Sequence, residues 1–337
     1  MKTRNNVNDT ASDVAQYKKV RVRVLGRGAR SKSKRQSPPS ASHTGSSTNV
    51  PATHLERRRG TAQSNRTQEN VAPSRVNHHK LLFGNWNVFT LTGKEIELVD
   101  EAKRYHLDVV GVSSTKRRGS GVVDLNDGWK LFYSGADPSM SAQAGVGILT
   151  SPQLSDCVTE WIPLGSWVCI LKLKVIDRAI CLLQVYAPNA SSEYQAFVDE
   201  VNDALLRVAP TESTVLMGDF NAHIGTDNET WKGVIGRHGV TGFNENGRYL
   251  LQLCCSNGLC IMNTFFQHRD IHKYTWYRPS LGQKSLIDFC IVSADLFSDV
   301  LDVRVKRGAE LSTDHHLVVC SLRFSKPRSS LITKSLK

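Results

Sequence analysis

Long hydrophobic runs are missing from this sequence. None reaches the roughly 18 apolar residues that a bilayer-spanning helix needs, so we expect no membrane span. The first residues, Met1 to Asn5, show no apolar core of the kind that a secretory signal carries, and we expect none. Without a secretory route, Asn-x-Ser/Thr triplets such as the one at Asn65 carry no expectation of a glycan.

Closely spaced cysteine pairs are also absent. The chain has eight cysteines, and no two of them form a Cys-x-x-Cys arrangement. Most lie within apolar runs, as Cys181 does between Ile180 and Leu182. Cysteines in such runs are usually buried free thiols in a reducing compartment, and we favour that interpretation over a zinc site.

Acidic residues are scarce in the first part of the chain. Residues 1–78 hold 16 Lys and Arg against 4 Asp and Glu, whereas the rest of the chain holds 27 of each. This first segment is rich in Ser, Thr and Asn, and it cannot bury enough apolar surface to offset its ordering entropy. We therefore predict a disordered basic tail over 1–78, a folded domain over 79–324 and a disordered end over 325–337.

Three basic clusters stand out in the predicted tail, at residues 18–23, 32–35 and 57–59. They are typical of a nuclear import signal or of an arm that binds nucleic acid, and equally of a solvated tail without such a role. On the first interpretation we expect a nuclear protein, with the cytoplasm as an additional location.

Short apolar runs begin at residue 80 and alternate with amphipathic segments. They predict strands at 81–88, 107–112, 129–134, 145–149, 168–175, 179–186, 214–217, 259–262, 286–292, 300–306 and 315–322. Amphipathic segments predict helices at 93–105, 191–208 and 245–257. Many strands with few helices predict an α/β domain in which two sheets pack together with helices outside.

The first two predicted helices carry local signals. In the helix at 93–105 the expected apolar side consists of Ile96, Val99, Ala102 and Tyr105. In the helix at 191–208 a serine at its start, residue 191 or 192, is the expected N-cap.

Polar residues occur where several predicted strands end or begin: Asn87, Tyr186, Asp219, Asn221, Asp288, Asp314 and His315. Asp288 lies inside an apolar run, where a carboxylate is costly to bury unless it is paired, and His315 is an available partner. Such a set can hydrolyse a phosphodiester. One carboxylate deprotonates water, a histidine held by a second carboxylate meets the phosphate, amide and phenol groups hold its oxygens, and a divalent metal offsets charge.

Each of these residues also has a structural interpretation. Asp219 and Asn221 could form an Asx turn, and Asp288 could belong to a structural ion pair. Asn87 could cap its strand and His315 could be a core histidine, while Tyr186 fits a packed aromatic as well as it fits a phosphate ligand. We favour function for all but Tyr186, which stays open, because the residues occur together.

Six blocks of this sequence, in this order, resemble the endonuclease/exonuclease/phosphatase superfamily, which includes deoxyribonuclease I and the apurinic/apyrimidinic endonucleases. The blocks are 86–88, 186–189, 218–221, 275–276, 287–289 and 313–315. The stretch at 218–225 is similar to the endonuclease domain of non-LTR (LINE-type) retrotransposons, and the domain to the craniofacial development protein 2 group that derives from such elements. The resemblance implies a four-layer α/β sandwich of the deoxyribonuclease I-like type, with two packed mixed sheets and the site at one edge.

The resemblance also implies roles for the matching residues. Asp219 would activate water, and Asn221 would help to place that water and the phosphate. Asp288 would orient His315, which would contact the scissile phosphate. Tyr186 would donate a hydrogen bond to a phosphate oxygen.

The metal site departs from the family pattern at one residue. The resemblance implies Mg²⁺ or Mn²⁺ held by Asn87, Asp314 and a glutamate, but Ser114 stands at the glutamate position. A neutral hydroxyl is a poor ligand for a hard cation, so we expect reduced metal affinity and weakened catalysis.

A basic run follows that position. Lys116, Arg117 and Arg118 would contact DNA phosphates, or they form a solvated loop. Trp276 would lie in the core or in a wall near the site, where it could contact nucleic acid.

Three functional hypotheses follow. The first is a retroelement-derived, Mg²⁺-dependent DNA endonuclease, expected to be monomeric and to bind the DNA phosphate backbone. A reverse transcriptase is not expected within this chain. The second is a catalytically inactive descendant that binds nucleic acid or protein. The third is a phosphatase of small phosphoesters, against which the sequence at 221–225 and the basic tail argue.

Overall fold

The computed structural model describes residues 79–139, 144–176 and 178–324. The predicted tail at 1–78 and the predicted end at 325–337 lie outside the described residues. The strands are β1 (His79–Asn87), β2 (Val109–Ser113), β3 (Ser120–Asp124), β4 (Lys130–Ser134), β5 (Val146–Thr150), β6 (Val158–Pro163), β7 (Val168–Val175), β8 (Arg178–Tyr186), β9 (Glu212–Asp219), β10 (Leu259–Ile261), β11 (Trp276–Arg278), β12 (Gln283–Ser285), β13 (Asp288–Ser293), β14 (Val300–Lys306) and β15 (Leu317–Phe324). The α-helices are α2 (Glu95–Arg104), α3 (Pro152–Ser155), α4 (Ser191–Leu205) and α5 (Glu245–Ser256).

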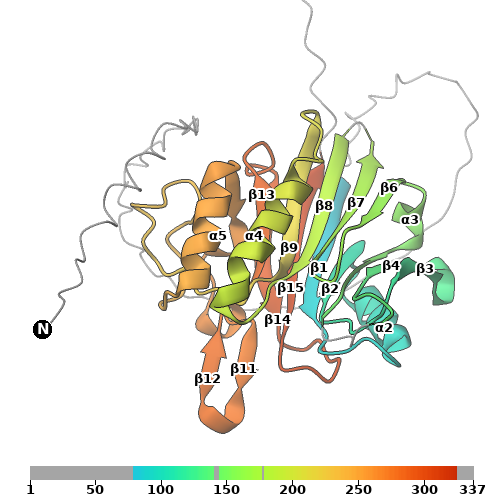
Figure 1. Ribbon diagram of the computed structural model, residues 1–337, viewed down its shortest axis with the longest axis horizontal. Helices are drawn as coiled ribbons and strands as arrows, with labels where there is room; N and C mark the ends of the chain where they lie inside the picture. Colours follow the sequence, from blue (N-terminus) through green and yellow to red (C-terminus); the bar gives the residue numbers. More distant parts are fainter. Residues whose placement is uncertain (1–78, 140–143, 177, 325–337) are drawn as a thin grey trace, which may run out of the picture. The chain divides into compact units, whose positions relative to one another are not determined.

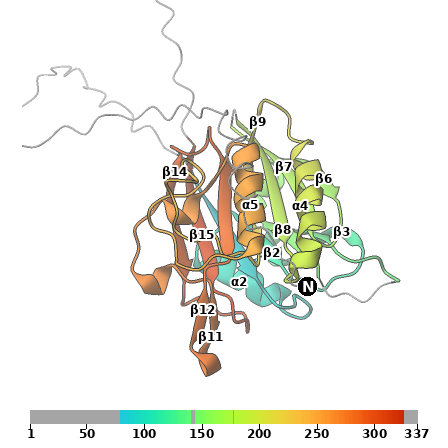
Figure 2. The ribbon, with the colours of Figure 1, turned by 60° about the vertical axis from the view of Figure 1, so that its left-hand side comes forward.

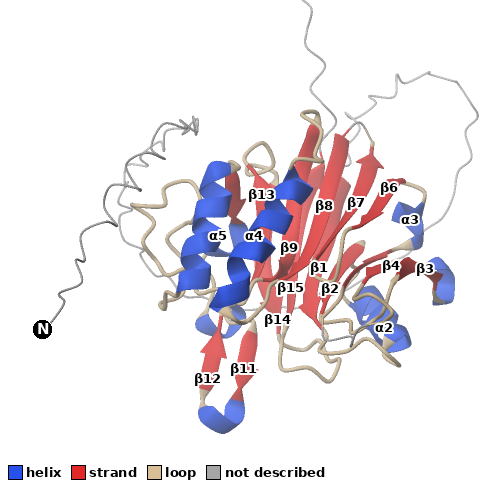
Figure 3. Cartoon of the chain, in the orientation of Figure 1, coloured by secondary structure: helices blue, strands red, loops and turns tan. Residues whose placement is uncertain are grey.

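The strands form two large sheets and one hairpin (Figures 1 and 3). One sheet has the order β14-β15-β1-β2-β5-β4-β3, and the other has the order β10-β13-β9-β8-β7-β6. Each is mixed, because β1 pairs in parallel with β2 and β8 with β9, whereas the other pairs are antiparallel. Strands β11 and β12 form a separate hairpin that extends away from the sheets (Figure 2).

Three apolar clusters hold the layers together. The central cluster contains Phe83 from the first sheet and Met217 from the second, so the sheets pack face to face. On the outer face of the second sheet, Phe197 of α4 and Leu250 of α5 are buried, and on the outer face of the first sheet Val99 of α2 is buried. This order of helix, sheet, sheet and helix confirms the predicted four-layer α/β sandwich.

The register of the central strands gathers polar residues at one edge. In the second sheet Tyr186, Asp219 and Asp288 lie side by side at the ends of β8, β9 and β13. In the first sheet Asn87 lies opposite Ser113 where β1 and β2 end. The predicted position of the site, where both sheets meet, follows from this register.

A buried amide ties the two sheets together behind this edge. The Asn85 Nδ2 of β1 donates to the Gly218 carbonyl at 2.9 Å, and its Oδ1 accepts from Gln184 Nε2 of β8 at 3.3 Å. Both side chains are almost fully buried, where each hydrogen bond avoids a desolvation penalty. The pair therefore fixes the distance between the sheets at the site.

Two local expectations were wrong. Ile96 is 63% exposed, because α2 turns Leu98, Val99 and Ala102 towards the sheet instead. Helix α4 begins at Ser191, so its N-cap is Ala190, which makes no side-chain cap hydrogen bond.

Several short elements were not predicted, namely β3, β6, β11, β12 and α3. The strands among them have few buried side chains: every residue of β3 and β6 is at least partly exposed. Edge strands and hairpins of this kind lack the apolar run that made the central strands recognisable.

The cysteines behave as expected within the described residues. All eight are free thiols, and six of them are buried. Among the described residues, the helices are all too short or too polar to cross a membrane.

Gly218 allows β9 to lie close to β8 just before the polar edge. A Cβ atom added at Gly218 would lie 2.2 Å from the Val185 carbonyl oxygen, a backbone atom that cannot turn away. Gly218→Ala should therefore lower the free energy of unfolding by about 1–3 kcal/mol in urea denaturation. Gly308→Ala is the control, since the added Cβ would meet only the Tyr105 hydroxyl. Equal stability of the two variants would contradict the proposed close approach.

Candidate active site

A cavity of about 520 Å³ opens at the polar edge of the sheets. Nine of the twelve residues predicted from the sequence line it: Asn87, Ser114, Lys116, Tyr186, Asp219, Asn221, Trp276, Asp314 and His315. Asp288 is fully buried and lies behind His315, to which it is hydrogen-bonded. Segments that are distant in sequence therefore converge on one cavity.

Two carboxylates flank a histidine at the centre of the cavity. The Asp288 Oδ2 lies 2.9 Å from His315 Nδ1, and the other ring nitrogen, Nε2, lies 3.8 Å from Asp219 Oδ2. At most 8% of any of these side chains is exposed. The Asp288 carboxylate accepts a hydrogen bond from His315 Nδ1, and this contact orients the ring. The other nitrogen, Nε2, then points towards Asp219 and the cavity.

The buried charges shift each other's protonation. Burial, reinforced by the charge of Asp288, raises the pKa of Asp219 to about 7 against the opposing effect of His315. Burial alone lowers the pKa of His315, but the surrounding carboxylates, foremost Asp288, outweigh it and raise that pKa to about 9. Near neutral pH the imidazole is therefore protonated, while Asp219 is close to its own titration point.

Amide groups fix the orientation of Asp219. The Asn87 Nδ2 donates to Asp219 Oδ2 at 2.8 Å, and the Asn221 backbone N–H donates to Asp219 Oδ1 at 3.0 Å. The Asn221 side chain donates to the Ala187 carbonyl at 2.8 Å, which anchors the turn after β9. Asp219 therefore has one defined orientation beside the open space of the cavity.

Tyr186 is half-buried in the same cavity. Burial, followed by the nearby charge of Asp219, raises the pKa of its phenol, while hydrogen bonds with Ser114 and Asn87 oppose the rise. Its hydroxyl is therefore protonated near neutral pH, as a donor to a phosphate oxygen must be.

A supporting layer of residues was not assigned from the sequence. The Thr275 Oγ1 accepts from the backbone N–H groups of Ile287 and Asp288 at 3.1 and 3.2 Å. The Trp86 Nε1 donates to the His315 carbonyl at 3.0 Å. Thr275 and Trp86 belong to two of the six sequence blocks that resemble the superfamily, and this resemblance could have pointed to them. Their hydrogen-bond partners cannot be read from the sequence.

Left-handed backbone conformations concentrate around the cavity. Among the described residues, eight that are not glycine have a left-handed backbone with positive φ. Five of the eight line this cavity or a second cavity next to it: Phe89, Ser114, Lys116, Asn221 and Ser312. Such conformations cost on the order of 1–3 kcal/mol each and persist where the surroundings impose them. Their concentration at one edge is typical of a functional site.

A buried group beside the cavity could supply ligands for a divalent cation. One ligand atom each from Asp219, Asp288 and His315 lies within 4.8 Å of the other two, so this buried group could hold a metal ion. Carboxylate and amide oxygens are suitable donors for hard cations.

The position predicted for the missing glutamate offers no carboxylate. The Ser114 Oγ donates to the Phe89 carbonyl at 3.2 Å, and the nearby Asp314 Oδ2 accepts from Trp276 Nε1 at 2.7 Å. The cationic side chain of Lys116 lines the same cavity. The residues present therefore fit a divalent cation, but with one charged ligand fewer and a positive charge nearby.

Two residues of the predicted basic run lie outside the cavity lining. Arg117 is half-buried and forms an ion pair with Glu95, and its guanidinium lies 4.9 Å from the centroid of the Tyr133 ring. Arg118 is exposed, and its Nη1 donates to the Pro138 carbonyl at 3.5 Å. Of the run, the structure brings only Lys116 to the cavity, and contact of the two arginines with DNA stays a prediction.

Comparison with known proteins supports the same family. A family described as endonuclease-reverse transcriptase matches residues 180–319. Craniofacial development protein 2 from Bos taurus is 26% identical over 244 residues, which cover 71% of this chain and 40% of the relative. The protein of that name from Tragulus javanicus is also 26% identical over 244 residues, which cover 71% of this chain and 42% of the relative. The chain thus spans about two fifths of the length of the curated relatives it matches. The resemblance to the endonuclease/exonuclease/phosphatase superfamily and to this protein group is confirmed.

Solved structures share the fold. The endonuclease domain of TRAS1, a telomere-specific non-LTR retrotransposon, matches with a TM-score of 0.54 at 17% identity, over 74% of this chain and 100% of that domain. The AP endonuclease LMAP from Leishmania major matches with a TM-score of 0.55 at 16% identity, over 77% of this chain and 91% of that one. Identities this low show a common fold, here the deoxyribonuclease I-like sandwich.

The coupling between Asp288 and His315 can be measured directly. Asp288→Asn removes the charge that raises the His315 pKa, so this pKa should fall below about 9. In the natural chain the raised pKa stabilises the fold below pH 6.5, and this contribution is lost as the pH rises through about 9. Histidine-ring NMR titration of both proteins in EDTA tests the shift. An unchanged His315 pKa would show that Asp288 does not set its protonation.

Proposed function

We propose that this chain is a retroelement-derived phosphodiesterase that cleaves DNA internally, with Mg²⁺-dependent catalysis weakened at Ser114. The main support for this proposal is the arrangement of Asp219, His315 and Asp288 at one cavity, where His315 lies between the two carboxylates. The fold shared with endonucleases, together with the family match over residues 180–319, supports the assignment to phosphodiester chemistry.

Asp219 acts as the general base in this proposal. A pKa of about 7 lets this carboxylate be ionised in part of the population and still accept a proton readily. The Asn87 and Asn221 hydrogen bonds hold its two oxygens in place, and Asn221 also borders the space that a water and phosphate would occupy. Attack of the deprotonated water on phosphorus breaks the bond to the leaving oxygen, which takes up a proton from solvent, and Asp219 afterwards returns its proton to solvent.

His315 and Tyr186 act on the phosphate. The protonated imidazole, held by Asp288, presents a positive charge to the negative phosphate oxygens, and charge develops on these oxygens as water attacks. Tyr186 adds a neutral hydroxyl donor.

A divalent cation would be held by Asn87 and Asp314 beside Ser114. When bound, it neutralises charge on the phosphate and on the leaving oxygen. Because Ser114 supplies no charge, we propose that the cation binds weakly and that cleavage is slow at millimolar Mg²⁺.

We propose DNA as the partner. Residues 79–337 hold equal numbers of basic and acidic residues, whereas residues 1–78 carry the excess of basic residues, so the tail would add salt-dependent affinity for the phosphate backbone. Nuclear localisation through the tail clusters and a monomeric state remain predictions.

A second candidate function is favoured by one observation. On one side of the cavity, Ser114 stands where the family pattern has a negatively charged glutamate, and Lys116 adds a positive charge. A catalytically inactive descendant that binds nucleic acid would retain the fold and the cavity but would not need a metal.

Nicking of supercoiled plasmid separates the two candidates. The proposal expects slow nicking by the natural chain in Mg²⁺ or Mn²⁺ and none in EDTA. Absence of nicking in both metals, with retained salt-sensitive binding in a gel shift, would favour the binding descendant and contradict the enzyme.

A further inference from the structure

Phe89 is an exposed aromatic residue at the mouth of the active-site cavity. Its side chain is 57% exposed, and its backbone φ is 61°. The Phe89 N–H donates to Asn87 Oδ1 at 3.0 Å, and its carbonyl accepts from Ser114 Oγ. Two residues of the site thus hold an apolar ring in the solvent, although burial of such a ring would be favourable.

Lys116 extends over this ring. Its Nζ lies 3.9 Å from the Phe89 ring centroid, within the range of a cation–π interaction. Lys116 also lines the cavity that contains Asp219 and His315. The ammonium group is therefore held where a phosphate in the cavity would meet it, on the side where Ser114 supplies no carboxylate.

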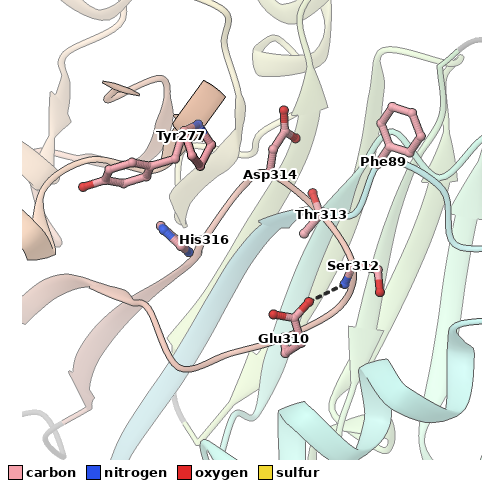
Figure 4. A pocket seen from close by; sticks show the side chains of 8 residues that line it. Phe89, Tyr277, Glu310, Ser312, Thr313, Asp314 and His316 are labelled. Atoms are coloured by element: carbon pink, nitrogen blue, oxygen red, sulfur yellow. Dashed lines mark hydrogen bonds between the residues drawn. The ribbon is translucent and has the colours of Figure 1, made fainter. Parts of the chain in front are cut away.

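A second cavity of about 530 Å³ adjoins the first. Phe89 and Asp314 line both cavities, so they form the boundary between them. Figure 4 shows Phe89 on one side of this second cavity and Tyr277 on the other, with Asp314 between. Lys116 lines the first cavity and is not among the residues that line the second.

The lining of the second cavity suits an uncharged planar group. Glu310 and Asp314 contribute carboxylates, and the described lining includes no lysine or arginine. A phosphate would be repelled here, whereas a nucleobase could stack on an exposed aromatic face.

We propose that Phe89 and Lys116 form a nucleotide-binding element that works without a divalent cation. The phosphate lies against Lys116 in the active-site cavity, and the adjoining base stacks on Phe89 in the second cavity. The base must be unpaired to reach the ring, so the ligand is a single strand or a locally opened one. This inference rests on the proposed function in that it assumes a nucleic-acid ligand.

The test uses the full chain and a single-stranded DNA tetranucleotide with a central 2-aminopurine, whose fluorescence falls when the base stacks. Titration in EDTA should show binding with quenching. Phe89→Leu keeps an apolar side chain but removes the ring, and should weaken binding by about tenfold and abolish the quenching. Lys116→Met should weaken binding and reduce the slope of log affinity against log salt by about 0.7.

Matched variants control for general effects. Phe243→Leu changes a phenylalanine that is 58% exposed and lines neither cavity. Lys103→Met removes a lysine charge from α2, where Lys103 forms an ion pair with Asp127 and lines neither cavity. Both should bind and quench the probe as the natural chain does. The same sequence as a duplex should not be quenched.

Several results would overturn the inference. If Phe89→Leu and Lys116→Met match their controls, or if quenching requires Mg²⁺, the element does not exist as described, and the proposed hydrolase is unaffected. The same holds if the natural chain nicks plasmid but does not bind the tetranucleotide, or if the duplex is quenched equally. A chain that neither nicks plasmid nor binds the probe would contradict both the element and the proposed function.

Discussion

Asp219→Asn should abolish most of the plasmid-nicking activity. An amide cannot accept the proton of the attacking water, and general-base catalysis typically contributes about 10²- to 10⁴-fold in rate. The substitution keeps the size of the side chain and an oxygen that can accept from Asn87 or Asn221. The initial rate of nicking in Mn²⁺, compared with that of the natural chain, measures the loss.

The same variant distinguishes catalysis from folding. The pKa of Asp219 is raised from 3.8 to about 7 in the folded chain, so ionisation of this buried group costs stability as the pH rises between these values. Asp219→Asn removes that cost, and its thermal unfolding at pH 8 should be no lower than that of the natural chain. A variant that folds normally and still nicks at the natural rate would show that Asp219 is not the base.

Ser114→Glu should raise the nicking rate on the order of 10²-fold in Mg²⁺. The new carboxylate would lie at the end of β2, where the family pattern has its metal-binding glutamate, and would add a charged oxygen close to Asn87. Affinity for Mn²⁺, measured by calorimetry, should rise in parallel, because a hard cation gains a charged ligand. This second readout does not depend on activity.

Ser114→Gln is the matched control. Glutamine has the size of glutamate without its charge, so it should leave both the nicking rate and Mn²⁺ affinity near those of the natural chain. Equal gains in the glutamate and glutamine variants would mean that shape, not charge, limits the site. No gain in either would mean that Ser114 is not the position of the missing ligand.

The central part of the fold could be predicted because its strands are buried on both faces. The run from Ala179 to Leu183 is apolar, and the end of the strand at Tyr186 is visible in the sequence. Strands β3 and β6 could not be found in this way, because their exposed side chains give no apolar run. Ile96 was misplaced because several helix phases fit a short segment, and the sheet selects the one that buries Leu98.

The members of the site could be predicted better than their interactions. Asp288 was recognisable because a carboxylate in an apolar run needs a partner, and the structure places His315 Nδ1 2.9 Å away. The tie between the sheets through Asn85 could not be predicted, since it depends on how β1 lies against β8 and β9. Phe89 gave no signal either, because its exposure results from hydrogen bonds that only the folded site provides.

The most direct test compares initial nicking rates of the natural chain, Ser114→Glu and the double variant Ser114→Glu/Asp219→Asn in Mg²⁺. If the chain is a hydrolase with a weakened metal site, the natural chain nicks slowly and Ser114→Glu nicks on the order of 10²-fold faster. The double variant then nicks no faster than the natural chain. A natural chain that nicks as fast as Ser114→Glu, or a double variant as fast as Ser114→Glu, would contradict it.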